Sequence, residues 1–161
     1  MALKGSRYTT DDLIDYFMNE VAEAGGPVVL STVGSGAALD DAAALVTYGA
    51  GPAQVSGVSF VGALMNDMVN IDQTRQHINF NKDEIQIGGK VAVLTRGWIV
   101  TDRIMPGVTP AINQAAYVGP SGYWTNVYPP DYGSRAGLFM STKDEDGYAK
   151  IFVKGPNLGD T

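Results

Sequence analysis

The sequence predicts a mainly β protein, an antiparallel barrel or sandwich built from successive hairpins, with an N-terminal α-helix and a flexible arm. Short runs rich in valine, isoleucine and aromatic residues follow one another from about residue 85 onward. Glycine, proline and Asp-Gly turn signals separate these runs, as expected for hairpins. The length of 161 residues suits one domain with a substantial core.

The first 24 residues are predicted to form the arm and the helix. Leu13, Phe17 and Val21 recur at four-residue spacing, which would place them along one face of a helix. The sequence Gly-Gly-Pro that follows residue 24 would end the helix. Residues 1–8 precede this pattern and are expected to be a flexible arm.

Residues 25–64 are rich in small side chains, with eight glycines and eight alanines. The segments PVVLSTV (27–33) and ALVTYGA (44–50) could be strands, and LDDAAAL (39–45) could be a short helix. Two arrangements stay open for this region: it could extend the barrel, or it could form a separate lobe.

Residues 65–161 are predicted to be the barrel domain, with three hairpins. KVAVLTRGWIV (90–100) is predicted to be two strands around a turn at Thr95-Arg96-Gly97. AAYVGPSGYWTNV (115–127) has a Gly-Pro-Ser-Gly turn between two strands. GLFMSTKDEDGYAKIFV (137–153) has an Asp-Gly turn, which is a strong hairpin signal.

Composition argues against several classes of partner. The net charge is −6 and the sequence pI is about 4.5, so we expect no nucleic-acid partner and no anionic membrane surface. There is no cysteine, which excludes thiolate catalysis and cysteine-based metal sites. The N-terminus has no apolar signal-peptide core, and no run of about 18 apolar residues could cross a bilayer. We therefore expect a soluble protein that is made in a cytoplasm.

His77 is the only histidine, and it lies in the polar stretch before the second half of the chain. A catalytic histidine needs an orienting partner, which Asp72 or Glu84 could supply. No second metal ligand stands at a workable spacing such as H-x-x-x-H. The alternative is a hydrogen-bonding residue in a polar connection, and we favour it. We predict no catalytic residue, no metal and no cofactor.

The carboxylates of Asp144, Glu145 and Asp146 invite a calcium-loop interpretation, but the spacing of an EF-hand loop is absent. A charged hairpin tip accounts for them better. Neither G-x-G segment, VGSGAALD nor YGAGPAQ, continues into a phosphate-binding motif.

The segment GYWTNVYPPDYGSR (122–135) gathers aromatic residues around two adjacent prolines, which indicate a loop at 128–133. Trp124, Tyr128 and Tyr132 could form a protein interface, because Tyr and Trp are enriched there. Trp124 could instead face the core of the 115–127 hairpin. A sugar-binding platform is the third alternative.

Three stretches carry a resemblance to a known family: NIDQTRQHINFNKDEIQIGGKVAVLTRGWIVTD (70–102), AAYVGPSG (115–122) and GLFMSTKDEDGYAKIFV (137–153). Their order is a G-x-K-V-x-V-L-x-x-G run, a Tyr-Val-Gly-Pro-x-Gly hairpin and a closing hairpin with Asp-x-Asp-Gly. This order resembles the capsid decoration proteins of tailed bacteriophages, also called cement or head-stabilising proteins. The resemblance covers about residues 60–153, and residues 1–59 have no clear counterpart.

The resemblance implies a non-enzymatic virion protein on the outer surface of an icosahedral phage capsid, made in the bacterial host cytoplasm. Its partners would be the major capsid protein and copies of itself, as a homotrimer. A β-tulip-like barrel is one form that the fold could take. An N-terminal arm would contact the capsid, and the residues expected at capsid or subunit interfaces are Leu3, Lys4, Arg7, Tyr8, Arg75, His77, Trp124, Tyr128 and Tyr132.

Two rival functions stay open. One is a carbohydrate-binding β module of a phage tail or fibre that uses Trp124, Tyr128 and Tyr132. The other is a small enzyme that uses His77 with Asp72 or Glu84.

Overall fold

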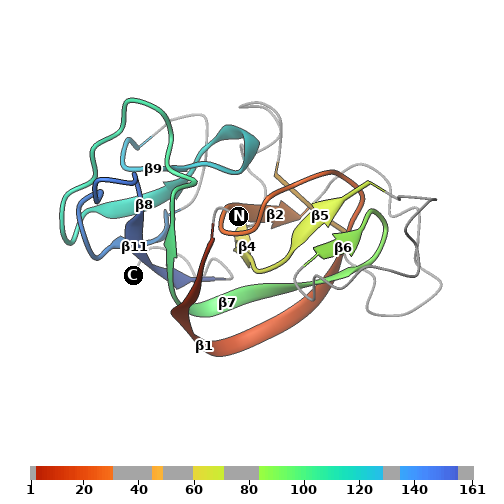
Figure 1. Ribbon diagram of the computed structural model, residues 1–161. Coiled ribbons are helices and arrows are strands. Elements are labelled where there is room, and N and C mark those ends of the chain that lie inside the picture. Colours follow the sequence, from red (N-terminus) through yellow and green to blue (C-terminus); the bar gives the residue numbers. More distant parts are fainter. Residues whose placement is uncertain (1–2, 31–44, 49–59, 71–83, 129–134, 156–161) are drawn as a thin grey trace.

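The structure is a computed structural model of the chain, and it describes residues 3–30, 45–48, 60–70, 84–128 and 135–155. The described residues form eleven strands and one short 3₁₀ helix, η1 (Figure 1). In chain order these are β1 (Leu3–Met18), β2 (Pro27–Leu30), β3 (Leu45–Thr47), β4 (Phe60–Leu64), β5 (Asp67–Val69), β6 (Glu84–Gln86), β7 (Lys90–Thr101), β8 (Ala115–Val118), η1 (Pro120–Gly122), β9 (Trp124–Thr125), β10 (Arg135–Phe139) and β11 (Ala149–Lys154).

Nine of these strands form one sheet in the order β1-β3-β2-β4-β7-β11-β10-β8-β9. A further pairing of β1 with β7 closes β1, β3, β2, β4 and β7 into a five-stranded barrel. The predicted mainly β barrel is therefore confirmed. The barrel is not wholly antiparallel, because β1 and β3 pair in parallel. Strands β5 and β6 form a separate parallel pair.

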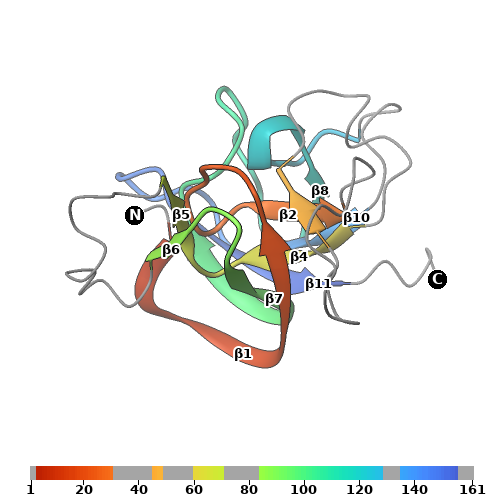
Figure 2. The same ribbon diagram turned by 90° about the vertical axis from the view of Figure 1, so that its right-hand side faces the viewer.

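The predicted N-terminal helix is wrong, because Leu3–Met18 is a 16-residue strand. It lies antiparallel along β7 from Leu3 opposite Thr101 to Phe17 opposite Lys90, and Figures 1 and 2 show the two strands side by side. Four-residue spacing is a multiple of the two-residue period of a strand as well as close to one helical turn. The periodicity therefore could not distinguish the two structures, and pairing with β7 decides between them.

The predicted flexible arm is also wrong for the part of it that the structure describes. Leu3, Lys4, Arg7 and Tyr8 all lie on β1. Leu3 is buried in the core with 6% of its surface exposed. Register shifts between Leu3 and Tyr8 interrupt the ladder with β7, so this end of β1 follows its partner irregularly.

The predicted hairpin at Thr95-Arg96-Gly97 is wrong as well, because β7 runs unbroken through these residues. Gly97 has a φ of 146°, a value that glycine adopts readily. It pairs with Thr10 of β1 on one side and with Val153 of β11 on the other. Glycine here lets one long strand pass from the barrel into the outer part of the sheet.

The other two predicted hairpins are confirmed. Strands β8 and β9 pair across η1, which occupies the predicted Gly-Pro-Ser-Gly turn. Strands β10 and β11 pair in an antiparallel ladder around the Asp-Gly turn, where Gly147 has a φ of 86°. The carboxylate of Asp144 accepts hydrogen bonds from the backbone N–H groups of Asp146 and Tyr148. The carboxylate of Asp144 thus organises this turn.

The strands predicted in 25–64 are present as β2 and β3, and both belong to the barrel together with β4. The described part of this region therefore extends the barrel. The short helix predicted at 39–45 falls mostly outside the described residues.

The hydrophobic core has two parts. Alternate residues of the same strands face one part or the other. One set fills the barrel and includes Met18, Val28, Leu64 and Val93. The other set lies between the barrel wall and strands β8 to β11. Val28 belongs to the first and Val29 to the second, as the two faces of a strand require. Strand β7 contributes residues to both parts of the core. Strands β8 to β11 therefore fold back over β2 and β4.

Candidate functional site

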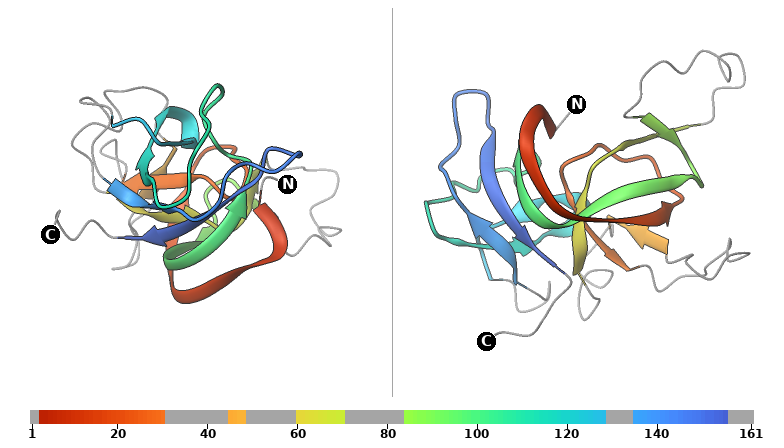
Figure 3. Two further views of the ribbon diagram at one scale, coloured as in Figure 1. Left: turned by 90° about the vertical axis from the view of Figure 1, so that its left-hand side faces the viewer. Right: turned by 90° about the horizontal axis from the view of Figure 1, so that it is seen from below.

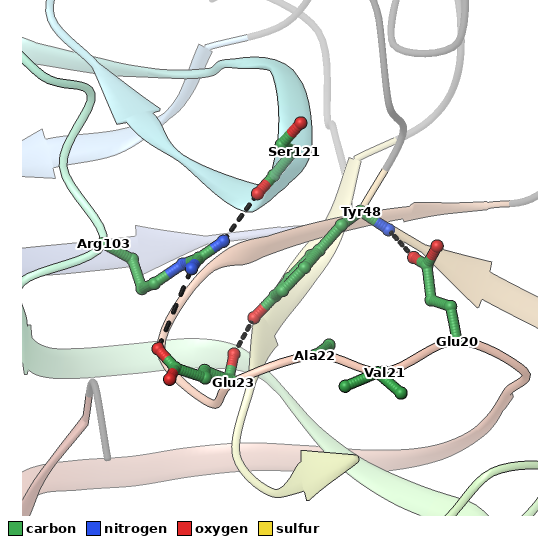
Figure 4. A pocket seen from close by; sticks show the side chains of 7 residues that line it. All are labelled: Glu20, Val21, Ala22, Glu23, Tyr48, Arg103 and Ser121. Atoms are coloured by element: carbon green, nitrogen blue, oxygen red, sulfur yellow. Dashed lines mark hydrogen bonds and ion pairs between the residues drawn. The ribbon is translucent and has the colours of Figure 1, made fainter. Parts of the chain in front are cut away.

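A pocket of about 290 Å³ lies where the barrel meets the β8–β9 hairpin. The segment between β1 and β2 forms one wall, the residue after β3 forms the floor, and the segment after β7 and η1 close the other side (Figure 4). The residues that line it are Glu20, Val21, Ala22, Glu23, Tyr48, Arg103 and Ser121.

Tyr48 is the buried centre of this pocket. Its hydroxyl donates a hydrogen bond to the carbonyl oxygen of Glu23 and accepts one from the N–H of Gly26 at 3.1 Å. Only 6% of its surface is exposed, and burial raises the pKa of its hydroxyl above the ordinary value of 10. Tyr48 therefore stays protonated at neutral pH and joins two backbone groups of the β1–β2 connection.

Arg103 lies between two aromatic rings. Its guanidinium carbon is 5.3 Å from the ring centroid of Tyr48 and 4.4 Å from that of Tyr123. Its Nη2 donates to the carbonyl of Ser121 at 2.6 Å, and its Nε donates to the carbonyl of Gly122 at 3.4 Å. A planar guanidinium suits both stacking and these in-plane hydrogen bonds, so Arg103 fixes η1 against Tyr48.

The two carboxylates of the pocket differ in their surroundings. Glu20 accepts hydrogen bonds from the Thr47 hydroxyl at 2.8 Å and from the N–H of Tyr48 at 2.5 Å. The Glu23 side chain is 61% exposed and lies 3.8 Å from Nη1 of Arg103. Glu20 therefore anchors the end of β3, while Glu23 forms a long, solvated ion pair that contributes little to stability.

Asp102 precedes Arg103 and lies near Glu23. Partial burial raises the pKa of its carboxyl, and the negative charge of Glu23 adds to this.

The polar groups of this pocket bind the protein's own backbone. The hydroxyl of Tyr48, the guanidinium of Arg103 and the carboxylate of Glu20 each contact main-chain atoms of another segment. These contacts brace the barrel against the β8–β9 hairpin. Within the described residues, no group of three or more His, Asp or Glu side chains is placed to hold a metal ion.

Trp124, which the sequence placed at an interface or in the core, is fully buried. Its Nε1–H donates to the carbonyl of Gly25 at 2.8 Å, and its ring packs edge-on against Phe60 at 6.0 Å. These contacts agree with the core alternative. A side chain with no exposed surface offers no platform to a sugar or to a protein partner.

Tyr128 is 67% exposed, and its ring packs edge-on against Tyr117 at 5.4 Å. Arg75, His77 and Tyr132 lie outside the described residues. The same holds for Asp72, the suggested partner of His77, whereas Glu84 begins β6.

Sequence reasoning missed Tyr48 and Arg103. The sequence shows the turn signals Gly25-Gly26-Pro27 and Gly-Pro-Ser-Gly, but it does not show that the two turns contact each other. A Cβ on Gly122 would lie 2.5 Å from the ring of Tyr48, and one on Gly26 would lie 2.3 Å from the carbonyl oxygen of Gly122. Glycine at both turns is therefore a condition for this close packing, which only the tertiary structure reveals.

No protein-family model matches the chain, and a search of curated proteins finds no match to it. Among the residues that the structure describes, no helix is long and apolar enough to cross a membrane.

Proposed function

We propose that the chain is a capsid decoration protein of a tailed bacteriophage. It binds the outer surface of the icosahedral head and stabilises contacts between major capsid subunits. It acts without catalysis or a cofactor, and it associates with copies of itself, for which the resemblance implies a homotrimer. It is made in the bacterial host cytoplasm and becomes part of the virion.

The observation that carries the proposal is where the resembling segments lie in the fold. The G-x-K-V-x-V-L-x-x-G run lies on β7 and the turn before it, the Tyr-Val-Gly-Pro-x-Gly motif spans β8 and η1, and the closing motif spans β10 and β11. These strands are neighbours in the order β7-β11-β10-β8-β9. Segments that lie apart in the sequence thus form neighbouring strands of one sheet, as expected if they serve one role.

The character of the pocket and of the surface also supports a binding role. The pocket's polar groups hold the protein's own backbone. Burial raises the pKa of Tyr48, which keeps its hydroxyl protonated at neutral pH and makes it a weak proton donor. Several large apolar side chains are exposed on the described surface: Leu13, Ile14, Val21, Ile112, Val127, Tyr128 and Met140. Apolar side chains of this kind supply contact area in protein interfaces.

A reconstitution experiment tests the proposal. Heads of the phage that encodes the chain are prepared without it, and purified protein is added in increasing amounts. We expect saturable binding at a stoichiometry fixed by the lattice, and a higher temperature of DNA release from the heads that carry the protein. Absence of binding to intact heads would refute the proposal, and binding without any gain in head stability would refute the stabilising role.

A further inference from the structure

The pocket between the β1–β2 segment and η1 has room for a ligand. Its volume of about 290 Å³ lies near the lower end of the range for small-molecule pockets, about 300–1,000 Å³. That volume suits one side chain or a small molecule of similar size. Val21 and Ala22 contribute apolar side chains to the wall, and the ring of Tyr48 forms the floor. A ligand that fits these surfaces therefore needs an apolar part.

The charged groups of the lining sum to a negative charge. The carboxylates of Glu20 and Glu23 stand against the single guanidinium of Arg103. Figure 4 shows Glu20 at the backbone end of Tyr48, and Glu23 with Arg103 at its hydroxyl end. Besides burial, the charges of Asp67 and Glu23 raise the pKa of the Tyr48 hydroxyl, against the opposite effect of Arg103. The pocket therefore favours a cation over an anion.

Both carboxylates that line the pocket have an oxygen to offer to a ligand. The two hydrogen bonds that Glu20 accepts both go to its Oε1, and no group in the described part of the chain bonds its Oε2. The Oε2 of Glu23 lies 3.8 Å from Nη1 of Arg103, which is too long for a hydrogen bond, and the side chain is 61% exposed. A carboxylate oxygen is the acceptor that an ammonium group requires.

Arg103, in contrast, uses its hydrogen-bond donors within the protein. Its Nη2 and Nε donate to the carbonyls of Ser121 and Gly122, and its guanidinium lies against the rings of Tyr48 and Tyr123. An arginine that recognises a phosphate or a carboxylate usually presents two parallel N–H groups to it. Because η1 already takes the edge formed by Nε and Nη2, the pocket offers a ligand mainly acceptors.

We propose that this pocket binds an alkylammonium group, whose source is either a free aliphatic diamine or a lysine side chain of another protein. The ammonium donates to the open oxygen of Glu20, and the methylene chain packs along Tyr48 and Val21. The second ammonium of a diamine lies beside Glu23. The inference goes beyond the proposed function and does not depend on it, because it concerns a ligand of the isolated chain.

Titration of the isotope-labelled full chain with cadaverine, followed by NMR, tests the inference. We expect saturable shifts at the amide groups of Tyr48 and Ser121, with a dissociation constant of about 1 mM or tighter at low salt. High salt should weaken binding several-fold, because it screens the charge pairs. Glutarate, a dicarboxylate with as many carbon atoms as cadaverine, is the matched control ligand and should not bind.

A second ligand distinguishes the two sources of the ammonium group. N-acetyl-lysine methylamide carries one ammonium on a methylene chain and represents a lysine side chain. Binding of this compound as tightly as cadaverine identifies a lysine side chain as sufficient. Binding of cadaverine about fivefold more tightly, or more, identifies the free diamine, since a second charge pair then contributes.

Two variants remove a negative charge from the pocket while they keep the size of the side chain. Glu20→Gln should raise the dissociation constant for cadaverine by about fivefold or more, because it replaces a charged acceptor by a neutral one. Glu23→Gln should raise it by about two- to fivefold, as expected for an exposed charge pair.

Glu145→Gln is the matched control, because it makes the same change on the β10–β11 turn, which projects from the sheet (Figure 3). The residues that line the pocket come from other elements, so the dissociation constant should stay within about 1.5-fold of the wild-type value. The spectrum of each variant shows whether it is folded, and Glu23→Gln alone decides if Glu20→Gln is not. Shifts that do not saturate, equal binding of glutarate, or a Glu23→Gln variant that binds cadaverine as tightly as the control would overturn the inference.

Discussion

Removal of the Tyr48 hydroxyl tests the account of the brace between the barrel and the β8–β9 hairpin. In Tyr48→Phe the carbonyl of Glu23 loses its donor and the N–H of Gly26 loses its acceptor. The Glu23 carbonyl and the Gly26 N–H both bond to a buried side chain. The free energy of unfolding should therefore fall by about 1–3 kcal/mol, which is the cost of leaving buried polar groups unpaired. The ring and its contact with Arg103 remain. Urea unfolding at pH 8 measures the change, with Tyr128→Phe at an exposed position as the control.

The same variant tests the raised pKa of Tyr48. Burial holds the hydroxyl protonated in the folded protein above pH 10, whereas the unfolded chain loses this proton near its ordinary value of 10. The folded state then binds more protons than the unfolded state, so stability falls as the pH rises past 10. The advantage of the wild type over Tyr48→Phe should shrink by about 1.4 kcal/mol between pH 8 and pH 11. An advantage that stays constant over this range, or a loss below about 0.5 kcal/mol at pH 8, would refute the reasoning.

Three further substitutions probe the fold, each by urea unfolding. Gly137→Ala would place a Cβ 2.0 Å from the carbonyl oxygen of Phe152 and should lower the free energy of unfolding by about 3 kcal/mol or more. The control, Gly147→Asn, should lower it by less than about 1 kcal/mol, because asparagine tolerates a positive φ. Equal losses in the two variants would contradict the close packing at Gly137. Trp124→Phe should cost about 2–3 kcal/mol through lost volume and a lost hydrogen bond, and a neutral result would mean that Trp124 is not buried. Asp144→Ala should lower the free energy of unfolding by about 1 kcal/mol, because it removes the hydrogen-bond acceptor in the β10–β11 turn. Asp144→Asn keeps an acceptor and should be nearly neutral. An equal loss in both variants would mean that the charge of Asp144, and not its hydrogen bonds, stabilises the turn.

Local signals in the sequence predicted what local geometry determines. The Asp-Gly and Gly-Pro-Ser-Gly turns lie within the hairpins that they close, so the β8–β9 and β10–β11 pairs were predictable. The β1 strand was not, because the spacing of Leu13 and Phe17 fits a strand as well as a helix. The turn predicted at Gly97 was wrong because a positive-φ glycine can also redirect a strand that has partners on both sides.

Local signals in the sequence could not predict the candidate site. Tyr48 and Arg103 meet because the barrel closes and η1 folds back over it. Both residues stand in unremarkable sequence, after a short strand and after a long one. Trp124 shows the opposite case: a tryptophan in an aromatic loop invites an interface interpretation, but its indole is enclosed by Gly25 and Phe60.

The most direct test of the central claim is the copy number of the chain in purified particles of the phage that we propose encodes it, measured by quantitative protein staining against the major capsid subunit. A decoration protein should be present at a ratio near one, or at a simple fraction set by the lattice. A handful of copies per particle would move the protein to the tail or neck and favour the carbohydrate-binding alternative. Absence from the particles would contradict both and return attention to His77.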